Sequence, residues 1–154
     1  MNVVFLDVDG VLNSDTNLVA MYNKTGKRYF GFDFPFDERC MENLVILVRC
    51  TKSKIVITSS WRKSKRGMKV LMAKLKEYGL DEEVIACTSI LNTSREDEIK
   101  TFLKGIDSRL NYIILDDKRN MGDLEQRVIR TDKAHGLTFG DVHLAVRKFE
   151  LFQK

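Results

Sequence analysis

The stretch 2-NVVFLDVDGVLN-13 joins an apolar run to two carboxylates and a glycine. The run from Val3 to Leu6 is continuously apolar, β-branched and aromatic, which is typical of a strand buried on both faces of a sheet. Asp7 and Asp9 follow it, and residues two apart in a strand point to the same face. Two carboxylates on one face repel each other unless a cation lies between them. The stretch therefore predicts a buried strand that ends either in solvated acids or at a bound cation.

Length and composition are those of a single globular domain. The 154 residues are 44% hydrophobic and 31% charged, which suffices for one sizeable core. No apolar run approaches the roughly 20 residues of a membrane helix, and no basic leader precedes the first strand, so we expect neither a membrane anchor nor a signal peptide. The three cysteines lack metal-ligand spacing and are expected as free thiols of a cytoplasmic protein. The net charge of +4 suggests an anionic partner.

Five apolar segments alternate with amphipathic ones. The expected strands lie in the opening stretch and in "KIVITSS", "EEVIACT", "NYIILDD" and "QRVIRTD". Helices are expected over 37–51, 63–78, 94–103 and 141–152. This alternation predicts one Rossmann-like, three-layer α/β domain over 1–154, with a parallel sheet covered by helices on both faces. Residues 14–36 are left over, a length that suits a small flap hairpin and is too short for a folded cap domain.

Polar side chains follow three of the expected strands. In open α/β sheets, ligands bind at the edge formed by the carboxyl ends of the strands. Acids and serines are also common turn formers, so each cluster alone is a weak signal. Together at one edge they indicate a functional site. The clusters are Asp7 with Asp9, Thr58 with Ser59 and Ser60, and Asp116 with Asp117.

The order and spacing of these clusters resemble the haloacid dehalogenase superfamily of phosphotransferases. "FLDVDGVLN" is similar to its first motif, "IVITSSW" to its second and "IILDD" to its fourth, the acidic metal motif. The combination of "DVDGVLN", "SSWR", "ILDD" and the pattern R-x-x-E-I (Arg95, Glu98, Ile99) is similar to small capless domains of this superfamily in RNA-repair and phage proteins. The resemblance implies a phosphatase with an open site.

The resemblance also implies roles for the clustered side chains. Asp7 would be the nucleophile that forms an aspartyl-phosphate, and Asp9 would be the general acid and then the base. Mg²⁺ would be bound by Asp7, by the backbone carbonyl of Asp9 and by Asp116, while Asp117 would reach a bound water. Such a cation would explain why the opening strand ends in two carboxylates. Asp9 favours phosphatase activity, because true dehalogenases lack this second aspartate.

Two motif positions leave alternatives open. The phosphate-binding hydroxyl of the second motif would come from Thr58 or Ser59; we favour Thr58, and helix capping is the competing role. The cation of the third motif would be Arg95, with Lys100 as the alternative. Arg95 lies in the first turn of its expected helix, where a cation opposes the helix dipole. Local stability therefore does not explain Arg95, although a pair with an acid such as Glu98 would.

A run of cations directly follows the second motif. Such a run is usually a solvated helix face, but this one begins at the catalytic edge, where it would follow a polyanionic backbone. We therefore expect contacts with nucleic acid from this segment. The residues are Arg62, Lys63, Lys65, Arg66 and Lys69.

Alternating phenylalanines occupy the second half of the 14–36 insert. In an extended chain they would share one face. That face would either stack on bases, with Lys24, Lys27 and Arg28 holding phosphates, or anchor the insert to the domain. We favour the anchor, because an exposed stripe of four phenylalanines promotes aggregation. The four are Phe30, Phe32, Phe34 and Phe36.

These features lead us to expect a Mg²⁺-dependent phosphomonoester hydrolase that acts on phosphorylated nucleic-acid ends or nucleotides. A small-metabolite phosphatase is the first alternative. A phosphoacceptor receiver domain also combines acids with a sheet, but its later strand carries a lone aspartate where this chain has Asp116 and Asp117. A non-catalytic nucleic-acid-binding relative is the third alternative, and the intact motifs argue against it.

Overall fold

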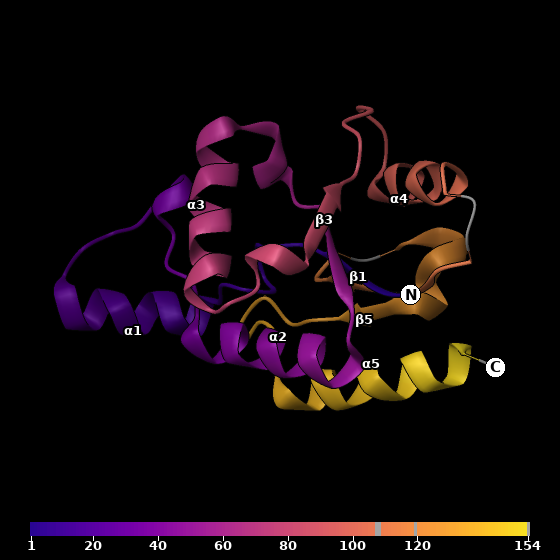
Figure 1. Ribbon diagram of the computed structural model, residues 1–154. Coiled ribbons are helices and arrows are strands. Elements are labelled where there is room, and N and C mark those ends of the chain that lie inside the picture. Colours follow the sequence, from indigo (N-terminus) through magenta and orange to yellow (C-terminus); the bar gives the residue numbers. More distant parts are fainter. Residues whose placement is uncertain (107–108, 119, 154) are drawn as a thin grey trace.

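The computed structural model describes residues 1–106, 109–118 and 120–153 (Figure 1). Over these residues the chain forms a sheet of five parallel strands in the order β3-β2-β1-β4-β5. The strands are β1 (Asn2–Leu6), β2 (Lys54–Ile57), β3 (Val84–Cys87), β4 (Asn111–Asp116) and β5 (Val128–Arg130). The α-helices are α1 (Asp15–Thr25), α2 (Glu38–Thr51), α3 (Lys65–Glu77), α4 (Arg95–Lys104) and α5 (Phe139–Phe152). The expected α/β class with a parallel sheet is confirmed.

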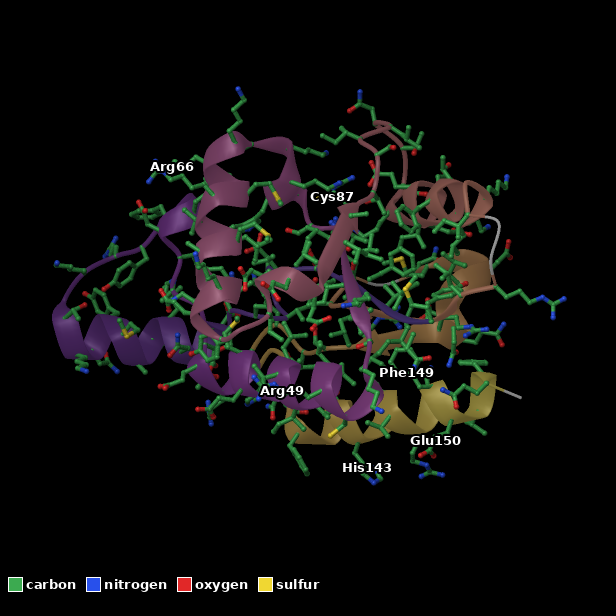
Figure 2. The ribbon with its side chains drawn as sticks, viewed as in Figure 1. Arg49, Arg66, Cys87, His143, Phe149 and Glu150 are labelled. Carbon is green, nitrogen blue, oxygen red and sulfur yellow. The ribbon has the colours of Figure 1, made fainter. Side chains whose placement is uncertain are left out.

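Helices cover both faces of the sheet because its side chains alternate between the two. In β1, Val4 and Leu6 belong to the larger apolar cluster, which includes α2, α3 and α5. Val3 and Phe5 point to the other face and belong to a second cluster with α4. Figure 2 shows Phe149 of α5 on the side of that helix that faces the sheet. Burial on both faces explains why the strands are continuously apolar.

The strand order reverses beside β1. The chain runs from β1 outward through β2 to β3, and it then forms β4 and β5 on the other side of β1. The Asp7 N–H donates to the Leu115 carbonyl at 3.1 Å, and the Thr58 N–H donates to the Leu6 carbonyl at 2.9 Å. These bonds align the three strands that carry the motifs up to their last residues. Sheets of this kind bind ligands at such a reversal, outside the carboxyl ends of the strands.

The 14–36 insert differs from the expected hairpin. Its first half is the helix α1, which Ser14 caps by accepting a hydrogen bond from the Asn17 N–H at 3.1 Å. Gly26 ends this helix in the left-handed conformation, with φ 70°. A loop then returns to a 3-10 turn, η1 (Gly31–Asp33), beside α3 (Figure 1). The hairpin prediction was wrong because both caps favour a local helix over strand pairing.

The basic segment after β2 forms two helical pieces where one helix over 63–78 was expected. The first is a 3-10 turn, η2 (Ser60–Lys63), and the second is α3. Ser64 separates them, because its extended backbone and its hydroxyl, which accepts from the Gly67 N–H at 3.3 Å, start a new helix.

The two ends of the chain meet at the amino edge of the sheet. Met1 and Asn2 line one surface pocket together with Phe152 and Gln153, and both ends lie on the right of Figure 1. Among the described residues we find no helix with the length and apolar surface that a bilayer crossing requires.

Candidate active site

Three carboxylates meet at the carboxyl ends of β1 and β4. Asp7 directly follows β1, Asp116 ends β4, and Asp117 follows it. One carboxylate oxygen of each lies within 4.8 Å of the others. Asp7 and Asp116 are buried, and Asp117 is half-buried. Carboxylate oxygens are the hard donors that Mg²⁺ prefers, so this cluster fits a divalent cation.

The surroundings of Asp7 favour its protonated form. Burial raises the pKa of the Asp7 carboxyl to about 7; Arg95 opposes this rise, and Asp116 and Asp117 add to it. Burial and the charge of Asp116 also raise the pKa of Asp117. A cation among these oxygens would lower both pKa values, because it favours the ionised carboxylates.

Arg95 brings positive charge to the acids. Its Nη1 lies 3.0 Å from Asp7 Oδ2 and 2.6 Å from Asp116 Oδ2, and its side chain is nearly buried. It is the first residue of α4, directly after the capping residue Ser94. Lys100, the alternative for the third motif, pairs with two other acids. The geometry therefore supports Arg95.

Two donors orient the carboxylate of Asp9. Trp61 Nε1 lies 3.2 Å from each of its oxygens, and Asn13 Nδ2 donates to Oδ1 at 2.8 Å. Asp9 itself is exposed, whereas Trp61 is buried. Trp61 thus packs in the core and also donates a hydrogen bond at the site. Asn13 and the indole N–H are contributions that the sequence analysis missed, although both residues lie in the motifs.

The insert packs against the same indole. The rings of Phe32 and Phe36 lie 5.0 and 5.5 Å from the ring of Trp61, edge to face. Phe30, by contrast, is 74% exposed. The anchoring role therefore applies to Phe32 and Phe36 and not to Phe30. The four phenylalanines do not share one face because η1 interrupts the extended chain.

The hydroxyl of Thr58 is available for a ligand. Thr58 is fully buried, and its Oγ1 is the buried side-chain polar atom for which we find no hydrogen-bond partner among the described residues. Buried polar groups normally have such a partner. Ser59 Oγ, in contrast, accepts a hydrogen bond from the Trp61 N–H at 3.2 Å and caps η2. The structure therefore supports Thr58 over Ser59 as the phosphate-binding hydroxyl.

Gly10 makes room for Asp117. Its φ is 76°, and a Cβ at this position would lie 2.3 Å from Asp117 Oδ2. Its backbone is fixed on both sides, because its N–H donates to Asn13 Oδ1 at 2.9 Å and its carbonyl accepts from Thr131 Oγ1 at 2.7 Å. A side chain here would displace Asp117 from the acid cluster, which explains the glycine in the first motif.

A buried ion pair joins the second-motif segment to α4. Arg62 Nη2 lies 2.5 Å from Glu98 Oε2, and the two side chains are 3% and 6% exposed. The Arg62 guanidinium also donates to the carbonyls of Thr58, Ser59 and Thr88. This network ties the end of β2, which Thr58 follows, to α4, whose first residue is Arg95.

Arg62 therefore does not belong to the exposed basic run. Its expected contact with nucleic acid was wrong, because the guanidinium is used within the fold. Lys63, Lys65 and Arg66 are exposed. Figure 2 shows Arg66 directed toward η1, where it pairs with Asp33 at 3.0 Å. The signal for the buried pair was present in the two motifs "SSWR" and "R-x-x-E-I", each of which contains one partner.

One comparison with known proteins matches a stretch of the chain that contains all of these site residues. The family model described as "HAD domain in Swiss Army Knife RNA repair proteins" matches residues 3–142. The matched range contains the acids, Thr58, Arg95 and the Arg62–Glu98 pair. Searches of curated proteins and of solved structures found no match.

Glu98→Ala should lower the free energy of unfolding by about 3–5 kcal/mol, because it leaves the Arg62 guanidinium buried without its acid. Urea denaturation followed by circular dichroism measures this loss. Glu77→Ala, which removes the exposed partner of Lys74, is the matched control and should cost no more than about 1 kcal/mol. Similar losses in the two variants would contradict a structural role for the buried pair.

Asp7→Asn should stabilise the metal-free protein at pH 8 and have little effect at pH 4. Because the folded protein holds the Asp7 proton more tightly than the unfolded chain does, wild-type stability falls as the pH rises from 3.8 toward about 7. Asparagine does not ionise and escapes this loss. Thermal unfolding in EDTA from pH 4 to pH 8 measures the difference, and a difference that stays constant over this range would contradict the raised pKa.

Proposed function

Because the chain belongs to the family of HAD (haloacid dehalogenase) domains found in Swiss Army Knife RNA repair proteins, we propose that it is a Mg²⁺-dependent phosphomonoester hydrolase. Its proposed substrates are phosphorylated nucleic-acid ends or nucleotides. Phosphoryl transfer requires a nucleophile, groups that hold the phosphate oxygens and positive charge around them. The observation that carries the proposal is that the ends of three adjacent strands and the start of α4 together offer all three. Asp7, Asp116 and Asp117 form the acid cluster with Arg95 beside it, and Thr58, whose hydroxyl has no partner among the described residues, directly follows the neighbouring strand β2.

Asp7 is the proposed nucleophile. Its carboxylate would attack the phosphorus in line with the leaving oxygen, so that the phosphate ester bond breaks as an aspartyl-phosphate forms. Water would then hydrolyse the aspartyl-phosphate, release inorganic phosphate and regenerate Asp7. Asp7, Asp116 and the backbone carbonyl of Asp9 would hold Mg²⁺, and Asp117 would reach a water bound to it; the ion would supply positive charge against the negative charge that the phosphate adds to the acids.

Asp9 is the proposed general acid and base. It would donate a proton to the leaving oxygen in the first step and would accept a proton from the attacking water in the second. The hydrogen bonds from Trp61 and Asn13 support this role, because they orient the carboxylate and leave it exposed to an incoming substrate.

Thr58 and Arg95 are the proposed phosphate-binding residues. The Thr58 hydroxyl would donate to a nonbridging phosphate oxygen and thereby gain the partner that a buried hydroxyl normally has. Arg95, which lies 3.0 Å from Asp7, would offset the charge that gathers as the phosphoryl group reaches that carboxylate.

The open approach to the site supports a nucleic-acid substrate over a small metabolite. Residues 14–36 contribute one helix and a short turn, an insert too small to enclose a substrate as a cap domain does. Lys63 ends η2, Lys65 and Arg66 begin α3, and all three are exposed within a few residues of Thr58. A polyanion that places its terminal phosphate at Asp7 would meet this positive surface. The RNA repair named in the family description is consistent with such a substrate.

Asp7→Asn should abolish phosphate release from p-nitrophenyl phosphate, because an amide is a poor nucleophile and a neutral ligand. EDTA should abolish wild-type activity and Mg²⁺ should restore it. Asp116→Ala should at least raise the Mg²⁺ concentration needed for half-maximal rate. Asp97→Asn, an exposed acid in the first turn of α4, is the control and should behave as wild type. A folded Asp7→Asn variant with normal activity would refute the mechanism.

Salt should weaken the binding of an oligonucleotide much more than that of a small ester. For a terminally phosphorylated single strand, log affinity should fall with log salt with a slope of about −0.7 for each phosphate neutralised. Replacing Lys63, Lys65 and Arg66 by Gln should flatten this slope and spare turnover of p-nitrophenyl phosphate. Measuring KM against KCl concentration for both substrates provides the test.

The control for this test removes the same charge elsewhere. Replacing Lys76, Lys104 and Arg147, which are also exposed, by Gln should leave the oligonucleotide slope steep. Equal slopes for the oligonucleotide and the small ester in the wild type would instead favour a small-metabolite phosphatase.

A further inference from the structure

A groove of about 400 Å³ lies between α1 and the loop that follows it. Leu18, Val19 and Tyr22 form its helix side, and the loop from Lys27 to Phe30 forms the other. Val19, Tyr22 and Phe30 are large apolar side chains that the fold leaves exposed. Figure 1 shows that α1 and this loop stand out from the body of the domain. An exposed apolar groove on an otherwise charged surface is typical of a binding site.

Aromatic rings dominate the lining of the groove. They are Tyr22, Tyr29 and Phe30. Of the four alternating phenylalanines, Phe30 is the one with more than half of its surface exposed. Phe32 and Phe36, which follow it in the chain, pack on Trp61. Bases of a single strand stack on such rings with little regard to sequence.

The charged side chains that line the groove are cations. Lys27 and Arg28 line it, and Lys24 lies in the last turn of α1. From residue 16 to residue 32 the sequence has three cations and no acid. Rings interleaved with cations match the bases and phosphates of a single-stranded nucleic acid. An apolar protein segment would match the rings and would leave the cations without partners.

The groove begins close to the acids. Asn13, which donates to Asp9, directly precedes the capping residue of α1. At 1.5 Å per residue, Tyr22 lies roughly 12 Å along the helix from Ser14. A strand whose terminal phosphate lies at Asp7 would therefore reach the groove within a few nucleotides.

We propose that this groove binds one or more bases of a single-stranded nucleic acid, a few nucleotides from the phosphorylated end. The groove would be a further substrate subsite of the proposed hydrolase, and this inference rests on that proposed function. It would allow the domain to prefer strands over mononucleotides without reading their sequence, because stacking accepts every base.

Binding of an unphosphorylated single-stranded hexanucleotide tests the groove apart from catalysis. In fluorescence anisotropy at low salt, Phe30→Ala should weaken binding about tenfold, which is the effect of losing one base–aromatic stack, and Phe30→Trp should retain it. Phe139→Ala, which removes a 64% exposed aromatic side chain on α5, is the matched control and should bind as wild type does. Equal affinities for the two alanine variants, or no binding by the wild type, would overturn the proposal.

Turnover distinguishes failure of the groove from failure of the hydrolase function. Phe30→Ala should raise the KM for a terminally phosphorylated hexanucleotide about tenfold and leave kcat and KM for p-nitrophenyl phosphate unchanged. If neither substrate is hydrolysed but Phe30→Ala still weakens hexanucleotide binding, the groove stands and the hydrolase function falls. If both are hydrolysed and Phe30→Ala changes neither KM nor binding, the function stands and the groove falls.

Discussion

The close approach of carboxylates at the ends of two neighbouring parallel strands is the constraint on which the rest of this domain depends. The pairing of β1 with β4 brings Asp7 and Asp116 together beyond the last apolar residues. Buried acids in such proximity require positive charge beside them. Arg95 supplies it from the first turn of α4, a position that the helix dipole disfavours. Electrostatic attraction therefore helps to place α4, together with the packing of Ile99 against the sheet.

Two consecutive residues of η2 have opposite orientations and separate effects on the site. The side chain of Trp61 reaches Asp9 and is braced by rings from the insert, whereas Arg62 turns inward to Glu98. The same short turn thus connects the first motif, the insert and α4. A displacement of η2 would disturb the orientation of Asp9 and the position of Arg95 together, which explains why the second motif extends beyond its hydroxyl residue.

Much of this arrangement was predictable, since buried parallel strands appear as continuous apolar runs and their carboxyl ends share one edge. The sequence favoured Thr58 and left Ser59 open, because only geometry shows that the Ser59 hydroxyl is used for capping and that the Thr58 hydroxyl is not. The helix α1 was missed because it has no buried residue and so lacks the apolar spacing of the other helices. Arg62 was misassigned because its partner is 36 residues away and a cation within a charged run resembles a solvated one.

The meeting of the two chain ends at the amino edge of the sheet affects how this domain combines with others. Met1 and Gln153 border one pocket, and β1, five residues long, separates that edge from the acids by roughly 17 Å. A polypeptide fused to either end would begin at the edge of the sheet opposite to Asp7. An attachment at either terminus would therefore leave the edge that carries the acids open to solvent.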